Sequence, residues 1–304
     1  MLMSFKKFKY TLINKFASKK KKLLWTLNNQ ISKEFICKPN ISVLKLTQDT
    51  NLGKKNERIF VTNDSYQTWY IMNNENFNDT FSLKIKDYIN KQYSYNFIDI
   101  GANTGLLTKS LINNNIDFKN IYCVEPDEDN FYCLENNLKN YSNIHKFNYA
   151  LDELDGEKKL YIDENNKGNL SFNFEMMNLE QDKLSFMNTK DNHITVKCMA
   201  INKFFEQVDP NNLNIVKIDV QGFDETIFSN IPNSILKKTS CLIIEITPLK
   251  SKEVNMNKFR EKLNCFDHFA KFDGTQISKN DVEKYVTFET GQSFDLIFSN
   301  KIIN

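Results

Sequence analysis

The chain has 304 residues, with 40 Lys and Arg against 38 Asp and Glu, and 40% of its residues are hydrophobic. This length suits one large domain or two ordinary ones, and the composition excludes collagen-like and intrinsically disordered chains. No stretch approaches the roughly 18 to 20 apolar residues that a membrane-spanning helix requires. The six cysteines form no C-x-x-C pair and several lie in apolar runs, which predicts reduced, buried thiols and a cytoplasmic protein.

The first 33 residues form a basic arm. They contain nine lysines and no acidic residue, whereas the remainder carries 31 basic and 38 acidic residues. Phe5, Phe8, Leu12 and Phe16 recur at helical spacing, which predicts a basic amphipathic helix. A solvated arm is the plain interpretation, and peripheral contact with an anionic membrane or glycolipid surface is the second. Lysines interrupt every apolar run at this end, so a secretory signal peptide is not predicted.

The next segment, 34–92, is predicted to be an N-terminal subdomain or lid. It contains β-like runs at 41–46 and 58–61, separated by Asn, Asp and Gly. A helical pattern follows at 79–91, where Phe81, Ile85 and Ile89 would share one face. The segment therefore combines strand and helix signals in an extension of the main domain.

The remaining residues, 93–304, alternate apolar strands with amphipathic helices, which predicts an α/β domain with a doubly wound, mostly parallel sheet. Strands are expected at 96–100, 121–125, 144–150, 215–220, 241–246, 266–272 and 294–299. The polar stretch 160–192 interrupts this alternation. We expect it to form an excursion over the carboxyl ends of the strands.

A glycine turn at the end of the first of these strands is the expected ligand site. Gly101 and Gly105 are spaced G-x-x-x-G, which differs from the G-x-G-x-x-G pattern of dinucleotide dehydrogenases. Twenty residues later the second strand ends in Glu125, whose carboxylate can accept hydrogen bonds from both hydroxyls of a ribose. Together these features favour an adenosine ligand without a pyrophosphate, and S-adenosylmethionine (SAM) is the candidate cofactor.

Several motifs at the strand ends occur in a recognisable order. They are Ile98-Asp-Ile-Gly-Ala-Asn-Thr-Gly105, Val124-Glu-Pro-Asp127, Lys217-Ile-Asp-Val-Gln-Gly-Phe-Asp224 and Ile244-Glu245. In this order the chain from Asn96 to Ser299 resembles the FkbM-family methyltransferases. The resemblance implies a class I methyltransferase fold, in which a Rossmann-like seven-stranded sheet has an antiparallel last strand. It also implies methyl transfer from SAM to a hydroxyl, often on a sugar or polyketide.

The resemblance also implies roles for individual residues. Those expected at the cofactor are Asp99, Gly101, Asn103, Gly105, Glu125 and Asp219. Asp219 would in addition orient the acceptor and take its proton, with Glu245 as the companion acid; these two are the catalytic candidates. Each has a plainer alternative, such as shaping a turn or capping a backbone. No metal is expected, although two strand-end acids could hold a divalent ion in a metal-assisted variant.

The chain departs from the family pattern at three positions. Asn202 replaces an Asp before the fourth strand, Gln221 stands where Glu is frequent, and Asp224 stands where Glu is usual. These departures put in doubt any role that needs a negative charge at 202 or 221. The segment Asn169-Leu170-Ser171 matches a family loop over the active site.

Three functions remain open at this stage. The leading one is SAM-dependent O-methylation of a sugar, glycan or glycolipid hydroxyl, with a small molecule or glycan as the partner. Methylation of RNA ribose or of another nucleic acid is the alternative that the basic arm favours. The five prolines include no Pro-Pro or Pro-Cys pair, so base methylation is disfavoured and nucleic acid is the less expected partner. The third is a non-catalytic Rossmann-like nucleotide-binding protein.

Overall fold

The computed structural model describes residues 31–38, 40–63, 67, 68, 71, 79–162, 170–173, 175, 192–248, 254–287 and 293–300. The helix predicted within the basic arm therefore lies outside the described residues, as does Asn169. No helix in the described part of the chain is long and apolar enough to cross a bilayer.

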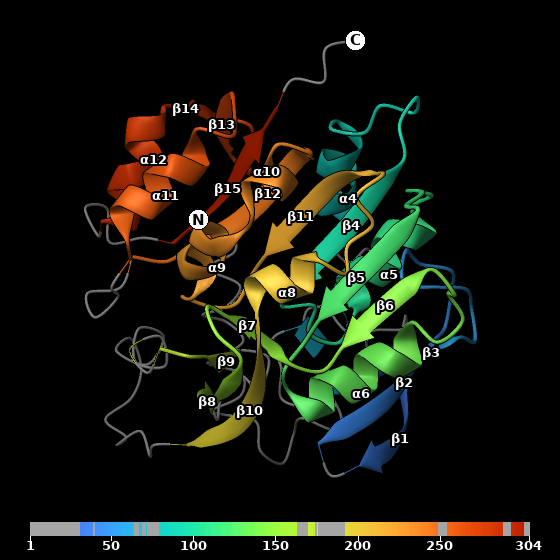
Figure 1. Ribbon diagram of the computed structural model, residues 1–304. Coiled ribbons are helices and arrows are strands. Elements are labelled where there is room, and N and C mark those ends of the chain that lie inside the picture. The colour runs from blue at the N-terminus through green and yellow to red at the C-terminus, as the bar shows by residue number, and fades with distance from the viewer. Residues whose placement is uncertain are drawn as a thin grey trace.

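The described residues are organised around one eight-stranded sheet (Figure 1). Its strands, in spatial order, are β14 (Gln276–Ile277), β13 (His268–Lys271), β15 (Phe294–Ser299), β12 (Thr239–Ile246), β11 (Leu213–Ile218), β4 (Tyr95–Ile100), β5 (Asn120–Val124) and β6 (Ile144–Phe147). Strands β6, β5, β4, β11 and β12 pair in parallel, and β15 runs antiparallel between β12 and β13. The predicted mostly parallel sheet with an antiparallel last strand is confirmed. The strand order reverses between β4 and β11, the position where open α/β sheets bind ligands.

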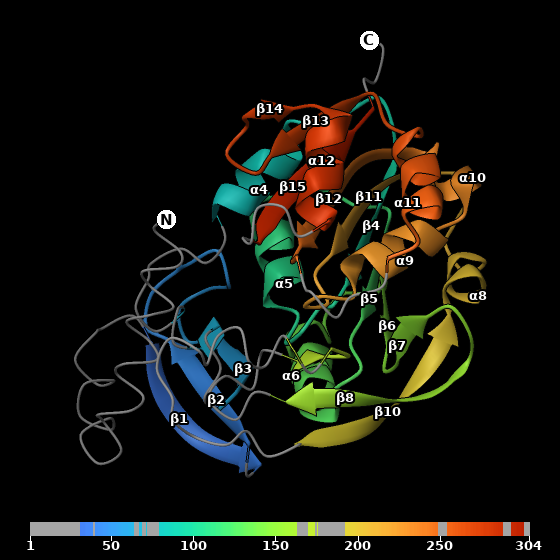
Figure 2. The same ribbon diagram turned by 90° about the vertical axis from the view of Figure 1, so that its left-hand side faces the viewer.

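Helices cover both faces of this sheet, which Figure 2 shows nearly edge-on. Side chains of α4 (Asp79–Lys86), α5 (Leu106–Asn113) and α6 (Glu128–Asn137) join the core on one face. The opposite core includes α8 (Ile201–Phe205), α9 (Asp224–Asn230), α10 (Asn233–Leu236), α11 (Met256–Leu263) and α12 (Lys279–Val286). Phe97 and Ile98 are adjacent in β4 and both fully buried in opposite cores, which explains why the strands read as continuous apolar runs.

A second, four-stranded sheet adjoins the main one. It contains β7 (Ala150–Asp152), β10 (His193–Ala200), β8 (Gly156–Ile162) and β9 (Leu170–Ser171) in that order. The prediction of a single strand at 144–150 was wrong, because β6 ends at Phe147 and Ala150 begins β7 in the other sheet. Between them, the Asn148 side chain donates to the carbonyl oxygens of Glu125 and Pro126, at 3.0 and 3.2 Å, where the ladder breaks.

The N-terminal segment forms a third sheet of antiparallel strands, β1 (Ile31–Lys38), β2 (Ile41–Leu46) and β3 (Arg58–Thr62). The runs predicted at 41–46 and 58–61 are confirmed as strands. The helix expected at 79–91 ends at Lys86, so it is shorter than predicted. Strand β1 begins at Ile31, and the last residues of the segment 1–33 therefore belong to this sheet.

Five cysteines, Cys123, Cys133, Cys198, Cys241 and Cys265, are free thiols. Four of them, Cys123, Cys133, Cys198 and Cys241, are buried, as their apolar sequence neighbourhoods predict. Burial raises the pKa of the Cys123 thiol well above its ordinary value, with the nearby Asp99 charge acting in the same direction. These thiols are therefore core residues rather than nucleophiles.

Candidate functional site

The glycine turn leaves β4 at the carboxyl edge of the sheet. Gly101, Asn103 and Gly105 have φ angles of 82°, 52° and 73°, in the left-handed region. Asparagine tolerates this region better than most residues, and the Asn103 side-chain oxygen accepts from the backbone N–H of Thr104 at 2.8 Å. Asn103 thus takes part in shaping the turn, which was the plainer of its two expected roles.

The packing of the chain around position 101 leaves room for glycine alone. A Cβ built on this residue would lie 2.0 Å from the carbonyl oxygen of Asp219, which follows β11. No side chain fits in that space. The first glycine of the motif therefore lets two neighbouring strand ends approach each other, whatever ligand lies beyond them.

Glu125 is held against this turn. The residue is 4% exposed, and its two carboxylate oxygens accept from the backbone N–H groups of Asn103 at 2.8 Å and Asp127 at 2.9 Å. Burial raises the pKa of Glu125 to about 8, with the Asp127 charge acting in the same direction and the backbone hydrogen bonds opposing it. A carboxylate oxygen has two acceptor positions, so each oxygen keeps capacity for a further donor.

Asp99 and Lys217 form a buried ion pair beneath the turn. Asp99 is fully buried, and its carboxylate accepts from the Thr108 hydroxyl at 2.8 Å and lies 3.3 Å from Lys217 Nζ. Lys217 also donates to the Gly101 carbonyl at 3.3 Å and lies 3.4 Å from an Asp219 oxygen. Burial opposes the charge of the lysine, but Asp219 and Asp99 outweigh it and raise the pKa of Lys217.

Sequence reasoning missed Lys217, although a signal was present. The lysine is the fifth of six residues in the mostly apolar strand β11, where a buried charge needs a partner. Lys217 pairs with Asp99 in the register between β11 and β4, and adjacent residues in register share one face of a sheet. The need of this lysine for an acidic partner could thus have been anticipated, whereas the register that supplies Asp99 comes from the structure.

The two catalytic candidates lie together at the ends of β11 and β12. The side-chain nitrogen of Gln221 donates to an oxygen of Asp219 and to an oxygen of Glu245, each at 2.7 Å. The Asp219 side chain is 40% exposed and can therefore be reached from solvent. Because Asp219 also borders Gly101, the turn and the acid pair occupy one edge of the sheet.

The second sheet also reaches this edge. The Ser171 hydroxyl donates to the Gln221 carbonyl at 2.5 Å, and the Phe172 ring packs edge-on against Phe223 with centroids 5.2 Å apart. Lys158 lies over the same Phe223 ring, 4.4 Å from its centroid. Ser171, which belongs to the segment that matches the family loop, thus contacts Gln221. The Gln221 amide in turn lies between Asp219 and Glu245.

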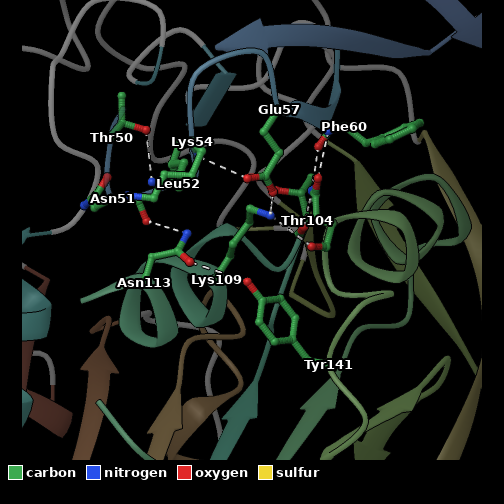
Figure 3. Close-up of polar contacts among 11 residues, drawn as sticks. Thr50, Asn51, Leu52, Lys54, Glu57, Phe60, Thr104, Lys109, Asn113 and Tyr141 are labelled. Atoms are coloured by element: carbon green, nitrogen blue, oxygen red, sulfur yellow. Dashed lines mark hydrogen bonds and ion pairs between the residues drawn. The ribbon is translucent and has the colours of Figure 1, made fainter. Parts of the chain in front are cut away.

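The N-terminal sheet approaches from the other side (Figure 3). Asn137 of α6 exchanges two 2.8 Å hydrogen bonds with the backbone of Phe60 in β3 and donates to the Thr104 carbonyl at 2.8 Å. The buried Lys109 of α5 pairs with Glu57, at 2.5 Å between Nζ and Oε1. The glycine turn is therefore tied to the N-terminal sheet through one asparagine.

All seven residues predicted for the site lie along the carboxyl edge of β4, β5, β11 and β12 or in the loops that follow it. Within the described ranges, no group of three or more His, Cys, Asp or Glu side chains could hold a metal ion. The carboxyl edge thus has the glycine turn and the buried acceptor Glu125 at one end. The two acids Asp219 and Glu245 lie at the other end.

These features define the class of the protein. An α/β sheet with this strand order, an antiparallel strand β15 and acids at the ends of successive parallel strands is a class I methyltransferase fold. The family model for the methyltransferase FkbM domain matches residues 99–273, which is more than half of the chain. The chain belongs to the FkbM methyltransferase family.

Solved structures of methyltransferases resemble the chain at low sequence identity. Methyltransferase FkbM from Methylobacillus flagellatus is 15% identical over 67% of this chain, with a TM-score of 0.40; the match spans 43% of that protein. Precorrin-6y C5,15-methyltransferase from Geobacter metallireducens is 9% identical, covering 72% of this chain and 87% of the other, with a TM-score of 0.33. A plantazolicin methyltransferase crystallised with S-adenosylhomocysteine (SAH) is 11% identical, covering 73% and 83%, with a TM-score of 0.35. No curated protein matches the chain.

Proposed function

We propose that the protein is a SAM-dependent O-methyltransferase that acts on a hydroxyl of a sugar, glycan or glycolipid. The observation that carries the proposal is Glu125, buried at the end of β5 and held by the backbone of the glycine turn. Beyond its two backbone hydrogen bonds, each carboxylate oxygen has capacity for one further donor. A ribose fits this capacity, because its two hydroxyls would each donate to one carboxylate oxygen.

The residues around the turn fit the rest of such a cofactor. Asp99, Gly101, Asn103 and Gly105 would line the methionine side, and the G-x-x-x-G spacing disfavours a pyrophosphate and hence NAD. Lys217 carries a positive charge under the same turn and pairs with the Asp99 side chain. A carboxylate of the cofactor would be attracted to the same charge. These assignments support SAM as the ligand of this edge.

Bound SAM supplies a methyl group on a positively charged sulfur. This chemistry would be an in-line transfer of the methyl group to the acceptor oxygen, in which the carbon–sulfur bond would break and leave its electron pair on sulfur. Asp219 would take the hydroxyl proton late in this displacement, and Glu245 would orient the acceptor. Most of the acceleration would come from positioning the two reactants.

The two acids and the family support this acceptor class. A partly exposed carboxylate suits a neutral hydroxyl, which it can orient and deprotonate. We further propose that the basic arm brings the enzyme to anionic surfaces from a cytoplasmic position, where a glycolipid acceptor would be presented.

Calorimetric titration with SAM, SAH and NAD tests the cofactor. We expect binding of SAM and SAH with micromolar affinity and none of NAD; binding of NAD alone would make the protein a nucleotide-binding Rossmann protein. Incubation with methyl-labelled SAM and separated glycan, lipid, RNA and protein fractions then tests the acceptor. Label in the glycan or lipid fraction supports the proposal, and label confined to RNA contradicts it.

A further inference from the structure

Gln221 lies between the two candidate catalytic acids. Its side-chain nitrogen is 2.7 Å from an oxygen of Asp219 and 2.7 Å from an oxygen of Glu245, so these two oxygens are no more than twice that distance apart. An amide nitrogen carries two hydrogens. Gln221 can therefore donate one hydrogen to each carboxylate at the same time.

The backbone presents this amide in a fixed position. Gln221 has a φ of 54°, a left-handed conformation that costs a long side chain free energy and persists where surrounding contacts impose it. Those contacts are present. Asp224 accepts from the backbone N–H groups of Val220 and Gly222, each at 2.9 Å, and the Ser171 hydroxyl donates to the Gln221 carbonyl at 2.5 Å.

The charges around the amide explain why a donor is needed there. Lys217 of β11 carries one positive charge and contacts Asp99 of β4 and Asp219, whereas Glu245 of β12 adds a third carboxylate. Two carboxylates this close repel each other, and one retains its proton unless a donor or a cation separates them. The Gln221 amide supplies two donors and no net charge.

We propose that Gln221 is the positioning residue of the methyl-transfer site, and that its amide takes the place a divalent cation would otherwise occupy between Asp219 and Glu245. The amide keeps both carboxylates ionised and fixes their separation without a metal. Ser171 extends this unit to the second sheet, so the acids and strand β9 are positioned together. The role of Gln221 in methyl transfer rests on the proposed function, whereas its hydrogen bonds to Asp219 and Glu245 do not depend on that function.

The first test replaces the Gln221 amide with a carboxylate, beside those of Asp219 and Glu245. Gln221→Glu places three acids around one point, a ligand set that Mn²⁺ or Ca²⁺ accepts. We expect Mn²⁺ to raise the melting temperature of this variant by about 2 °C or more over EDTA. The wild type and Gln207→Glu, the same change at an exposed position, should shift by less than about 1 °C. An equal shift in the wild type, or no shift in Gln221→Glu, overturns the proposal.

A second variant keeps the test decisive if Gln221→Glu does not fold. Gln221→Met preserves length but removes both donors, so Asp219 and Glu245 should repel each other when both are ionised. We expect its melting temperature to fall further below the wild type at pH 8 than at pH 5, where one acid regains a proton. A deficit of the same size at both pH values would indicate a packing role and overturn the proposal.

SAH titration of the same samples separates this inference from the proposed function. If the wild type binds no SAH, the proposed function fails, whereas the cation and pH measurements still report on Gln221. If SAH binds to wild type and variants alike, the effects belong to the acid pair rather than to the cofactor site.

Discussion

Glu125 is the residue whose chemistry can be followed most directly. Its pKa of about 8 means that the carboxyl is largely protonated at neutral pH, because burial disfavours its charge. Two ribose hydroxyls need an ionised carboxylate as acceptor. Binding of SAM or SAH should therefore release a proton, and the ligand affinity should depend on pH.

We predict that SAH binds the wild type more tightly as pH rises from 6 to 8, by at most about tenfold per unit. Gln at position 125 cannot release a proton, so Glu125→Gln should bind more weakly, by about 1–3 kcal/mol at pH 8, with an affinity that is flat in pH. Calorimetry in buffers of different ionisation enthalpy measures both quantities. Equal pH slopes in the two proteins would contradict the ribose assignment.

The same group links stability to pH in a fixed direction. The folded-state pKa of Glu125 lies above the ordinary value of 4.5, so the folded protein binds the proton more tightly than the unfolded chain does. The contribution of Glu125 to the free energy of unfolding should fall as pH rises from about 4.5 to 8. In Glu125→Gln this fall should be absent, which denaturant titrations at pH 5 and 8 would reveal.

Gly101 gives a second prediction at this scale. Any side chain at this position meets the Asp219 carbonyl, and the φ of 82° is unfavourable for other residues. Gly101→Val should therefore abolish SAH binding and also lower the free energy of unfolding, by about 1–3 kcal/mol or more. Asn103→Gly relieves a left-handed residue and is a matched control that should fold normally. Full SAH affinity in Gly101→Val would place the cofactor elsewhere.

At the scale of elements, the N-terminal sheet is attached to α5 through an ion pair between Lys109 and Glu57, whose side chains differ in burial. The Lys109 side chain is only 4% exposed, whereas that of Glu57 is 37% exposed. Figure 3 shows the side chain of Lys109 pointing toward Glu57, and its ammonium group also donates to the Asn137 carbonyl at 3.3 Å. Loss of one partner therefore has a different consequence from loss of the other.

Removing the acid should cost more than removing the base. Glu57→Ala leaves a buried ammonium without its carboxylate, for which we expect a loss of about 3 kcal/mol in the free energy of unfolding. Lys109→Met keeps the apolar stem and leaves a carboxylate that water can reach, so we expect about 1 kcal/mol or less. Denaturant unfolding of both variants measures the difference, and equal losses would show that the pair acts only through packing.

At the scale of the whole molecule, the charge distribution separates the arm from the folded body. Residues 1–30 carry eight lysines and no acidic residue, and the rest of the chain has 32 basic and 38 acidic residues. The N-terminal sheet begins at Ile31, so a truncation that starts there keeps every described strand.

We predict that deleting residues 1–30 leaves SAH affinity unchanged and reduces binding to vesicles that contain anionic lipid. The wild-type interaction should weaken as salt rises, because charges are screened over about 8–10 Å near physiological ionic strength. Co-sedimentation at 50 and 300 mM salt, with neutral vesicles as control, measures this. Equal vesicle binding by both proteins, or a large fall in melting temperature on truncation, would assign the arm to the fold instead.

The sequence by itself determined the sheet and the edge at which the candidate site residues lie. Apolar runs such as Phe97-Ile98 predict strands buried on both faces, and the carboxyl ends of parallel strands meet at one edge. Glu125, Asp219 and Glu245 each end such a strand or follow it, so their placement at that edge was predictable. The G-x-x-x-G turn was predictable as well, because glycine readily adopts the left-handed backbone that such a strand-to-helix turn uses.

Only the tertiary structure decided which of these groups touch one another. The pairing of Lys217 with Asp99 depends on the register of two strands more than a hundred residues apart, and the division of 144–150 between two sheets depends on where Asn148 donates. Gln221 reads in the sequence as the loss of a charge, yet in the structure it joins two acids. Sequence patterns report local periodicity and residue chemistry, whereas contacts between distant residues depend on how the elements pack.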